Sequence, residues 1–222
     1  LNIPTPDNYK LGPGDEVIVD IWGNSETTIR QVISPEGNIN VPGIGPIYLN
    51  GKQIKEASSY LTNVFGRIYS DLISGDPKTF LKLSLGQIRS IRVNVMGEVV
   101  MPGTYTLPSL ATIFHALYSA GGVSNVGTLR DVILYRNGRP FKHIDVYEYI
   151  MKGDDSVDIT LQDGDLINIG TYQKIVTISG NVKRPMRYEL KNDESLEQLL
   201  EYAGGFSSNA YKKNLNVSRK GD

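Results

Sequence analysis

The chain has 222 residues, of which 40% are apolar and 21% are charged, and its formal net charge at pH 7 is -1. This composition is typical of soluble globular domains, and it gives no electrostatic argument for binding nucleic acid or an anionic membrane surface, because both favour a strongly basic face. The absence of cysteine excludes disulfides and thiolate metal sites, and no apolar run approaches the roughly 18 residues of a membrane-spanning helix.

The first part of the chain predicts a small sheet with one long helix. Alternating apolar and polar residues are typical of half-buried strands, and such segments lie at residues 16–22, 29–34, 39–41 and 80–85. Apolar residues at steps of three and four predict an amphipathic helix over residues 52–69. Residues 42–46 and 70–78, which contain proline and glycine, are expected to be irregular links.

One stretch of the later chain occurs twice. Residues 95–107 (VMGEVVMPGTYTL) align with residues 178–190 (ISGNVKRPMRYEL), and each copy is followed by a helical pattern that ends in Ala-Gly-Gly. Gly180 follows Gly97 by 83 residues, and the closing glycines keep the same interval, so the copies align without a gap. The repeat indicates that one folding unit has been duplicated, and a period this long suits a small domain better than a solenoid coil.

Each copy is expected to begin with a hairpin. Gly97 interrupts an alternating strand, where a bulge or a close approach of the backbone is expected. Pro102 and Gly103 fit the central positions of a type II turn, because proline presets the first dihedral and glycine accepts a positive one. The turn returns the chain into a partner strand that contains Tyr105 and Leu107.

A helix is expected after each hairpin, with Ser109 and Asp193 as the caps and paired glycines as the stop. Its buried stripe is expected to consist of Leu110, Ile113, Phe114 and Leu117 in the first copy and Leu196, Leu199 and Leu200 in the second. Further strands of the first copy are expected at residues 132–135, 141–144 and 166–169. Two strands, a crossing helix and further strands describe a β-grasp-like unit of the α+β class.

The search for catalytic and metal sites finds no motif. His115 is expected to be a partly buried helix residue, and His143 has no carboxylate or cysteine at metal-ligand spacing. Residues 122–127 (GVSNVG) lack the glycine spacing and the preceding strand of a nucleophile elbow. Calcium-loop spacing is also absent, so solvated turns are expected for Asp154, Asp155, Asp158, Asp163 and Asp165. We therefore expect no catalytic residue, no metal and no cofactor.

Aromatic side chains are the other candidates, because sugars often bind to aromatic faces with a polar rim. Tyr105 and Tyr188 share a repeat position and are expected to have a structural role, and Tyr118 and Tyr202 are read as a second equivalent pair. Trp22 is expected beside the core. Exposure is expected for Tyr147, Tyr149, Tyr172 and Tyr211. Nothing in the sequence places these rings on one surface, so the carbohydrate-contacting residues stay unknown.

Both copies resemble the SLBB domain, the soluble ligand-binding β-grasp module. The resemblance rests on the pattern G-E-V-x-x-P-G-x-Y-x-L, on the helix ending in A-G-G, and on R-x-G at Arg136 and again at Arg219. The residues before them resemble the N-terminal domain of bacterial polysaccharide export proteins, through residues 9–15 (YKLGPGD), 22–23 (WG) and 34–46 (SPEGNINVPGIGP). The resemblance implies an α+β chain with a polysaccharide export domain at residues 1–88, a first SLBB domain at residues 89–172 and an incomplete second one at residues 173–222.

The family resemblance also implies a function. It suggests the periplasmic part of an outer-membrane exporter of capsular or extracellular polysaccharide, assembled as a homo-oligomeric ring that meets an inner-membrane polysaccharide copolymerase. No nucleic acid partner and no enzymatic activity are expected. Because the start at Leu1 carries no signal peptide, we expect the chain to be trimmed from a longer ectodomain anchored through other parts.

Two alternatives stay open from the sequence. The first is a non-catalytic carbohydrate-binding module that holds polysaccharide at the cell surface, and it would show affinity for oligosaccharide as a monomer. The second is a hydrolase or lyase acting on polysaccharide, which would need paired carboxylates converging on a cleft. The scattered Asp and Glu residues supply no motif for such an enzyme.

Overall fold

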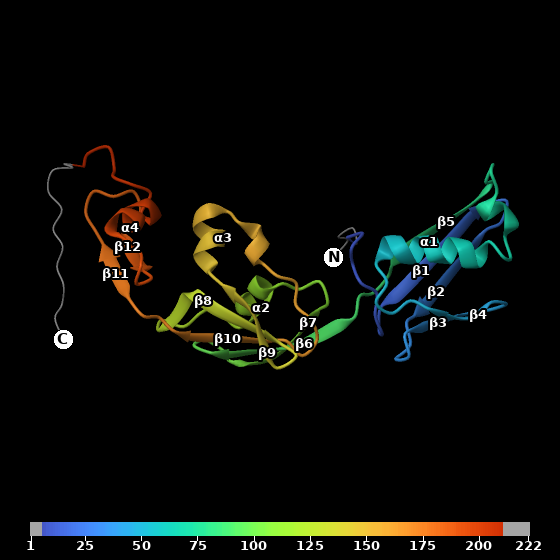
Figure 1. The fold of residues 1–222 in the computed structure, drawn as a ribbon, viewed down its shortest axis with the longest axis horizontal. Helices are drawn as coiled ribbons and strands as arrows, with labels where there is room; N and C mark the ends of the chain where they lie inside the picture. The colour runs from blue at the N-terminus through green and yellow to red at the C-terminus, as the bar shows by residue number, and fades with distance from the viewer. Residues whose placement is uncertain (1–5, 211–222) are drawn as a thin grey trace. The chain divides into compact units, whose positions relative to one another are not determined.

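The computed structural model describes residues 6–210, and the chain divides into two compact units, Leu1–Ser90 and Ile91–Asp222. Each unit mixes strands and helices (Figure 1). The first unit contains β1 (Glu16–Gly23), β2 (Thr27–Val32), β3 (Asn38–Val41), β4 (Gly45–Tyr48), α1 (Ile54–Phe65), the 3-10 turn η1 (Ser70–Ile73) and β5 (Thr79–Leu85).

The first unit is a three-stranded antiparallel sheet in the order β2-β1-β5, with the separate hairpin β3-β4 beside it. Alternation along β1 buries Val17, Val19 and Ile21 on one face, as the sequence predicts. The helix α1 contacts β5 and buries Ala57 and Leu61, so its apolar stripe closes the small core.

Three expectations for the first unit are wrong in detail. The helix ends at Phe65 instead of residue 69, because Gly66 and the tight 3-10 bonds after it break the helical pattern, and Ile68 is left exposed. The link expected at residues 42–46 contains the start of β4, since the positive φ of Gly43 and Gly45 turns the chain back along β3. The loop expected at residues 70–78 likewise includes η1.

The second unit holds both repeat copies. The first copy contains β6 (Ser90–Gly97), β7 (Gly103–Pro108), α2 (Ile113–Ser119), β8 (Gly127–Arg136), β9 (Arg139–Ile144), α3 (Val146–Lys152), η2 (Asp155–Val157) and β10 (Leu166–Thr171). Its strands form one sheet in the order β7-β6-β10-β8-β9, with β6 and β10 parallel. Buried side chains of this sheet and of α2 form a continuous core that includes Val95, Ile113, Val132 and Ile167.

The described part of the second copy is smaller. It contains β11 (Ile175–Ile178), its antiparallel partner β12 (Met186–Glu189) and α4 (Leu196–Tyr202). Its core consists of Tyr188, Leu190, Leu199, Tyr202 and Ala203, and Tyr147 of the first copy completes it. Two-stranded units are marginal in isolation, so the second copy depends on the first for part of its core.

The two copies repeat the same backbone contacts 83 residues apart. The Met101 amide donates to the Ala120 carbonyl at 2.9 Å, and the Arg184 amide donates to the Ala203 carbonyl at the same distance. Gly97 and Gly180 both have positive φ, as do the paired glycines that end α2 and α4. At Gly97 a Cβ atom would lie 2.1 Å from the Ile169 carbonyl oxygen, so the expected close backbone approach is confirmed.

Several local details of the repeats differ from expectation. Gly103 is not among the glycines with positive φ, so the hairpin turn is not type II. Thr112 is the N-terminal cap of α2 in place of Ser109, and Ser195 caps α4 in place of Asp193. Leu196 at the start of α4 is 53% exposed instead of joining the buried stripe, whereas Ile113, which begins α2 at the equivalent position, is fully buried.

Candidate functional site at the junction of the two repeats

The junction between the two repeat copies is built around Arg130 on β8. This side chain is only 4% exposed, and its guanidinium binds two carboxylates in bidentate fashion. The atoms Nε and Nη2 donate to Asp145 at 2.9 and 3.0 Å, and Nη1 and Nη2 donate to Glu194 at 2.8 and 2.6 Å. Asp145 belongs to the first copy and Glu194 to the second, so Arg130 ties the copies together.

The guanidinium is also held by aromatic rings and a backbone carbonyl. It lies 4.3 Å from the ring centroid of Tyr147 and 5.4 Å from that of Tyr202, and these two rings meet edge to face. Nη1 donates to the Glu189 carbonyl at 3.0 Å. A desolvated cation over aromatic faces adds stabilisation of about 2 kcal/mol. The surroundings therefore compensate for the burial of this charge.

A second group of bonds joins β12 to the start of β8. The buried Glu189 carboxylate accepts from the Thr128 hydroxyl at 2.5 Å and from the Leu129 amide at 2.7 Å. The Glu189 amide donates to the Tyr147 hydroxyl at 2.9 Å. Together with the Arg130 ion pairs, these largely buried bonds join the second copy to the first. We call this set of contacts the junction clamp.

The clamp perturbs the pKa values of its own members. Burial opposes ionisation of Glu194, but hydrogen bonds from Arg130 and Tyr202 outweigh it and lower the pKa of Glu194 to about 2. The pKa of Asp145 is also lowered, because Arg130 and Lys191 outweigh the effect of burial. Burial and the Glu194 hydrogen bond raise the pKa of Tyr202 to about 12. Arg130, Asp145 and Glu194 are therefore charged at neutral pH, and the Tyr202 hydroxyl keeps its proton.

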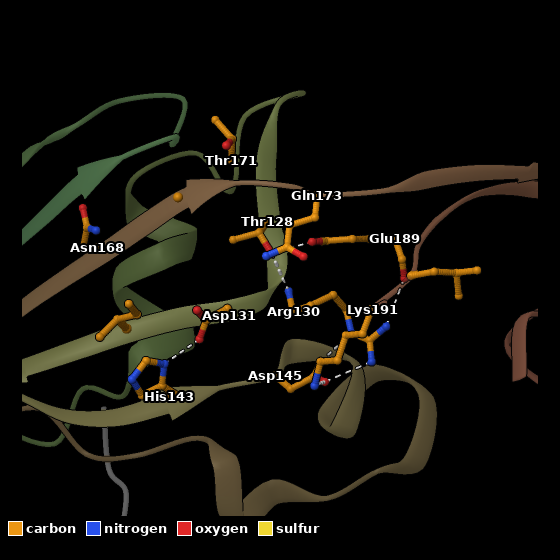
Figure 2. A pocket seen from close by; sticks show the side chains of 13 residues that line it. Thr128, Arg130, Asp131, His143, Asp145, Asn168, Thr171, Gln173, Glu189 and Lys191 are labelled. Atoms are coloured by element: carbon orange, nitrogen blue, oxygen red, sulfur yellow. Dashed lines mark hydrogen bonds and ion pairs between the residues drawn. The ribbon is translucent and has the colours of Figure 1, made fainter. Parts of the chain in front are cut away.

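Beside the clamp lies a cleft of about 410 Å³, shown with its lining side chains in Figure 2. Its floor is the face of the first-copy sheet opposite the core, since Asp131 and Ile133 alternate with buried residues of β8. Ile133 is paired with Asn168 on β10 and with His143 on β9, so these three residues form a row across adjacent strands. Thr171 and Lys191 also line the cleft.

The charged groups of the cleft are already paired with one another. His143 Nδ1 lies 2.6 Å from an Asp131 carboxylate oxygen, and both side chains are more than half exposed. Lys191 Nζ lies 2.6 Å from Asp145, on the outer side of the clamp. The sequence spacing gives no sign of the His143 pair, because Asp131 lies on the neighbouring strand.

The structure corrects several sequence-based site predictions. His115 is exposed instead of partly buried, and its Nδ1 accepts from the Thr112 amide at 3.2 Å in a capping box. Asp165 is 1% exposed instead of solvated, and it forms a bidentate pair with Arg136 at 2.9 and 2.7 Å. Asp154, Asp155 and Asp163 are exposed, as expected, and Asp158 is partly buried.

The aromatic predictions are mixed. Tyr105 and Tyr188 do share a structural role, since their hydroxyls donate to the Met101 and Arg184 carbonyls, which are equivalent in the repeat. The second proposed pair is wrong, because Tyr118 is 90% exposed and aligns with Glu201 at the 83-residue period, whereas Tyr202 is buried.

The remaining aromatic residues divide between core and surface. Tyr147 is buried in the junction instead of exposed, Tyr149 is 42% exposed as expected, and Tyr172 is partly buried. Trp22 is 45% exposed and stacks on the equally exposed Phe80, because both project from the sheet face opposite α1. Tyr211 and Arg219 lie outside the described residues.

Arg130 and Glu194 were missed by the sequence analysis. A signal for Arg130 exists, because it occupies the same alternating, inward-facing set of positions on β8 as the buried Val132 and Leu134. Its partners could not be identified in this way, since Asp145 and Glu194 lie 15 and 64 residues away.

Comparison with known proteins gives three domain matches. A family model described as polysaccharide biosynthesis/export protein matches residues 3–74. Models of the SLBB domain match residues 91–169 and residues 175–222. The chain is thus an α+β protein in which a polysaccharide export domain is followed by two SLBB domains.

Two groups of characterised relatives are similar to the chain. It is 27% identical over 185 residues to the polysialic acid transport protein KpsD of Escherichia coli. The aligned region covers 83% of this chain and 32% of that protein. It is 25% identical over 226 residues to the EPS I polysaccharide export outer membrane protein EpsA of Ralstonia nicotianae. The aligned region covers 90% of this chain and 57% of that protein. The chain therefore spans less than two thirds of either relative. Among residues 6–210, no helix combines the length and the apolar character needed to cross a membrane.

Proposed function

Because the chain joins a polysaccharide export domain to two SLBB domains, we propose that it forms part of the wall of a conduit that exports polysaccharide through the outer membrane. The chain acts there as a non-enzymatic component on the periplasmic side. The domain division is residues 1–88, 89–172 and 173–222. In the full-length protein, copies assemble as a ring that meets an inner-membrane polysaccharide copolymerase.

The junction clamp is the structural observation that best supports this role. A conduit wall must keep its shape while polymer moves past it, and domains joined only by a linker would change their relative orientation. Arg130 instead binds a carboxylate on each SLBB domain, and Tyr147 completes the core of the second domain. Buried contacts therefore hold the two SLBB domains to each other, which suits a wall element.

Deletion and complementation test the proposed role. The full-length gene that encodes this chain is deleted from its bacterium, and surface and secreted polysaccharide are quantified before and after complementation. We expect export to be lost on deletion and restored by the intact gene. Unchanged export in the deletion strain would refute the proposal.

The cleft at the junction of the two SLBB domains favours a second candidate function, a carbohydrate-binding module that retains polymer at the cell surface. Its polar lining supports this reading. The two functions differ in where polymer is found after deletion. Loss of a retention module releases polymer into the medium at an undiminished total, whereas loss of an exporter reduces the polymer outside the cell.

A further inference from the structure

We propose that the cleft beside the junction clamp is a binding subsite for one uncharged sugar residue of the transported polysaccharide. This inference rests on the proposed function and specifies which kind of sugar residue in the polysaccharide the SLBB domains bind. The subsite consists of Ile133 as its floor and of Asp131, His143, Asn168 and Thr171 as its polar groups.

The floor of the subsite presents a small apolar surface between hydrogen-bonding groups. Ile133 is partly buried, and its cross-strand neighbours are Asn168 on one side and His143 on the other. A pyranose ring has apolar C–H faces and a rim of hydroxyls. Such a ring placed over Ile133 would bring its hydroxyls to the flanking amide and imidazole, which is the arrangement of apolar surface and few polar groups typical of small-molecule sites.

The polar groups of the subsite have hydrogen-bonding capacity to spare. Within the described part of the chain, neither the Asn168 amide nor the Thr171 hydroxyl makes a side-chain hydrogen bond. Among residues 6–210, Asp131 pairs only with His143, which leaves further lone pairs on its carboxylate. These groups offer both donors and acceptors, as sugar hydroxyls require. In contrast, Arg130 and Glu189 are committed to the clamp.

The charges around the cleft exclude an anionic sugar as the preferred ligand. The lining contains three carboxylates and two cations, Arg130 and Lys191, and both cations are paired with Asp145. A ligand carboxylate would have to compete with Asp145 and would approach Asp131, so repulsion would oppose its binding. An uncharged, hydroxyl-rich residue meets no such penalty.

The size of the cleft fits a weak and local contact. Its volume of about 410 Å³ lies in the lower part of the range of about 300–1,000 Å³ for small-molecule sites. Because the site is lined by exposed groups and offers one aliphatic floor, we expect a dissociation constant on the order of 1 mM. Weak contacts of this kind hold a polymer near the wall and still release it as it moves.

The test is an NMR titration of the 222-residue chain labelled with nitrogen-15. The probes are oligosaccharides made by partial hydrolysis of the strain's own surface polysaccharide, cellotetraose as a neutral glycan and oligosialic acid as an anionic one. We expect saturable shifts at the amides of Asp131, His143, Asn168 and Thr171 with at least one neutral probe, and weaker shifts with oligosialic acid.

Paired variants separate the subsite from the rest of the surface. Asn168→Ala and Thr171→Val should each weaken binding at least fivefold, because each removes a free polar group from the cleft. The matched controls Asn40→Ala and Thr177→Val change exposed residues of β3 and β11 outside the cleft and should leave binding unchanged.

Three results would overturn the subsite. These are no saturable shift at its residues with any probe, tighter binding of oligosialic acid than of every neutral probe, or shifts that centre on Trp22 and Phe80. Its failure is distinguishable from failure of the proposed function, because export in the deletion strain is measured independently of sugar binding by the isolated chain.

Discussion

Replacement of Arg130 by alanine tests the junction clamp most sharply. The substitution removes four charge-assisted hydrogen bonds and leaves Asp145 and Glu194 in sites where their side chains are 11% and 10% exposed. Breaking one partner of a buried ion pair costs about 3–5 kcal/mol. Asp145 keeps Lys191 as a partner, and Glu194 keeps the Tyr202 hydroxyl, so the lower end of that range applies.

We therefore expect Arg130→Ala to lower the free energy of unfolding by about 3 kcal/mol. Urea denaturation measures the total loss, and hydrogen exchange resolved by peptide shows where it occurs. Because the second SLBB domain borrows Tyr147 and the clamp from the first, residues 175–210 should lose protection before β6, β8 and β10 do. The control Arg187→Ala changes an exposed arginine on β12.

The clamp would be refuted as the main tie between the domains by a loss below about 1 kcal/mol, the range of exposed ion pairs. Unchanged exchange over residues 175–210 would refute it equally. A loss of the same size in Arg187→Ala would show that the assay does not separate buried from exposed arginines.

Three further predictions follow from single side chains. The pKa of Glu194 is lowered from 4.5 to about 2, so its contribution to stability is complete above pH 4.5 and is lost as pH falls toward 2; Glu194→Gln should remove this part of the acid dependence of urea unfolding. Gly97→Ala should destabilise the first SLBB domain by more than about 1 kcal/mol in thermal denaturation, because its Cβ would lie 2.1 Å from the Ile169 carbonyl oxygen at a positive φ. Asp165→Ala should cost about 3 kcal/mol in the same assay, because it leaves Arg136 without its buried partner.

Each of these predictions has a matched control in the chain. Glu197→Gln lies on the exposed side of α4 and should leave the acid dependence unchanged. Gly138 has a positive φ, as Gly97 does, but a Cβ added at Gly138 would meet no atom within 4 Å. The difference in stability between Gly97→Ala and Gly138→Ala therefore measures the cost of the steric clash alone. Asp193→Ala removes an exposed carboxylate and should cost less than about 0.5 kcal/mol. Equal effects in a variant and its control would contradict the reasoning.

The repeated unit could be predicted from the sequence because its signals are local. Gly97, the closing glycines and the alternating strands each specify a backbone conformation within a few residues, and the structure shows them at equivalent places in both copies. The helix α3 was missed, although Asp145 at its start and Gly153 with positive φ at its end are standard helix boundaries.

The junction could not be predicted, because it depends on contacts between distant residues. The sequence predicts solvated turns for the aspartates of residues 154–165, and this is wrong for Asp165, because its side chain is buried against an arginine 29 residues away. Nor does sequence spacing identify a partner for His143, because the paired Asp131 lies on the neighbouring strand β8. The alternation of buried and exposed side chains along β8 predicts that Arg130 faces inward. Only the packing of the second domain shows what Arg130 binds.

The site of polymer accumulation tests the exporter assignment most directly. Polysaccharide is measured separately in the periplasm and outside the cell, in the strain that lacks the full-length gene and in its parent. The account predicts that polymer outside the cell falls sharply while periplasmic polymer rises. Unchanged amounts in both fractions would contradict the assignment of this chain to the wall of a polysaccharide conduit.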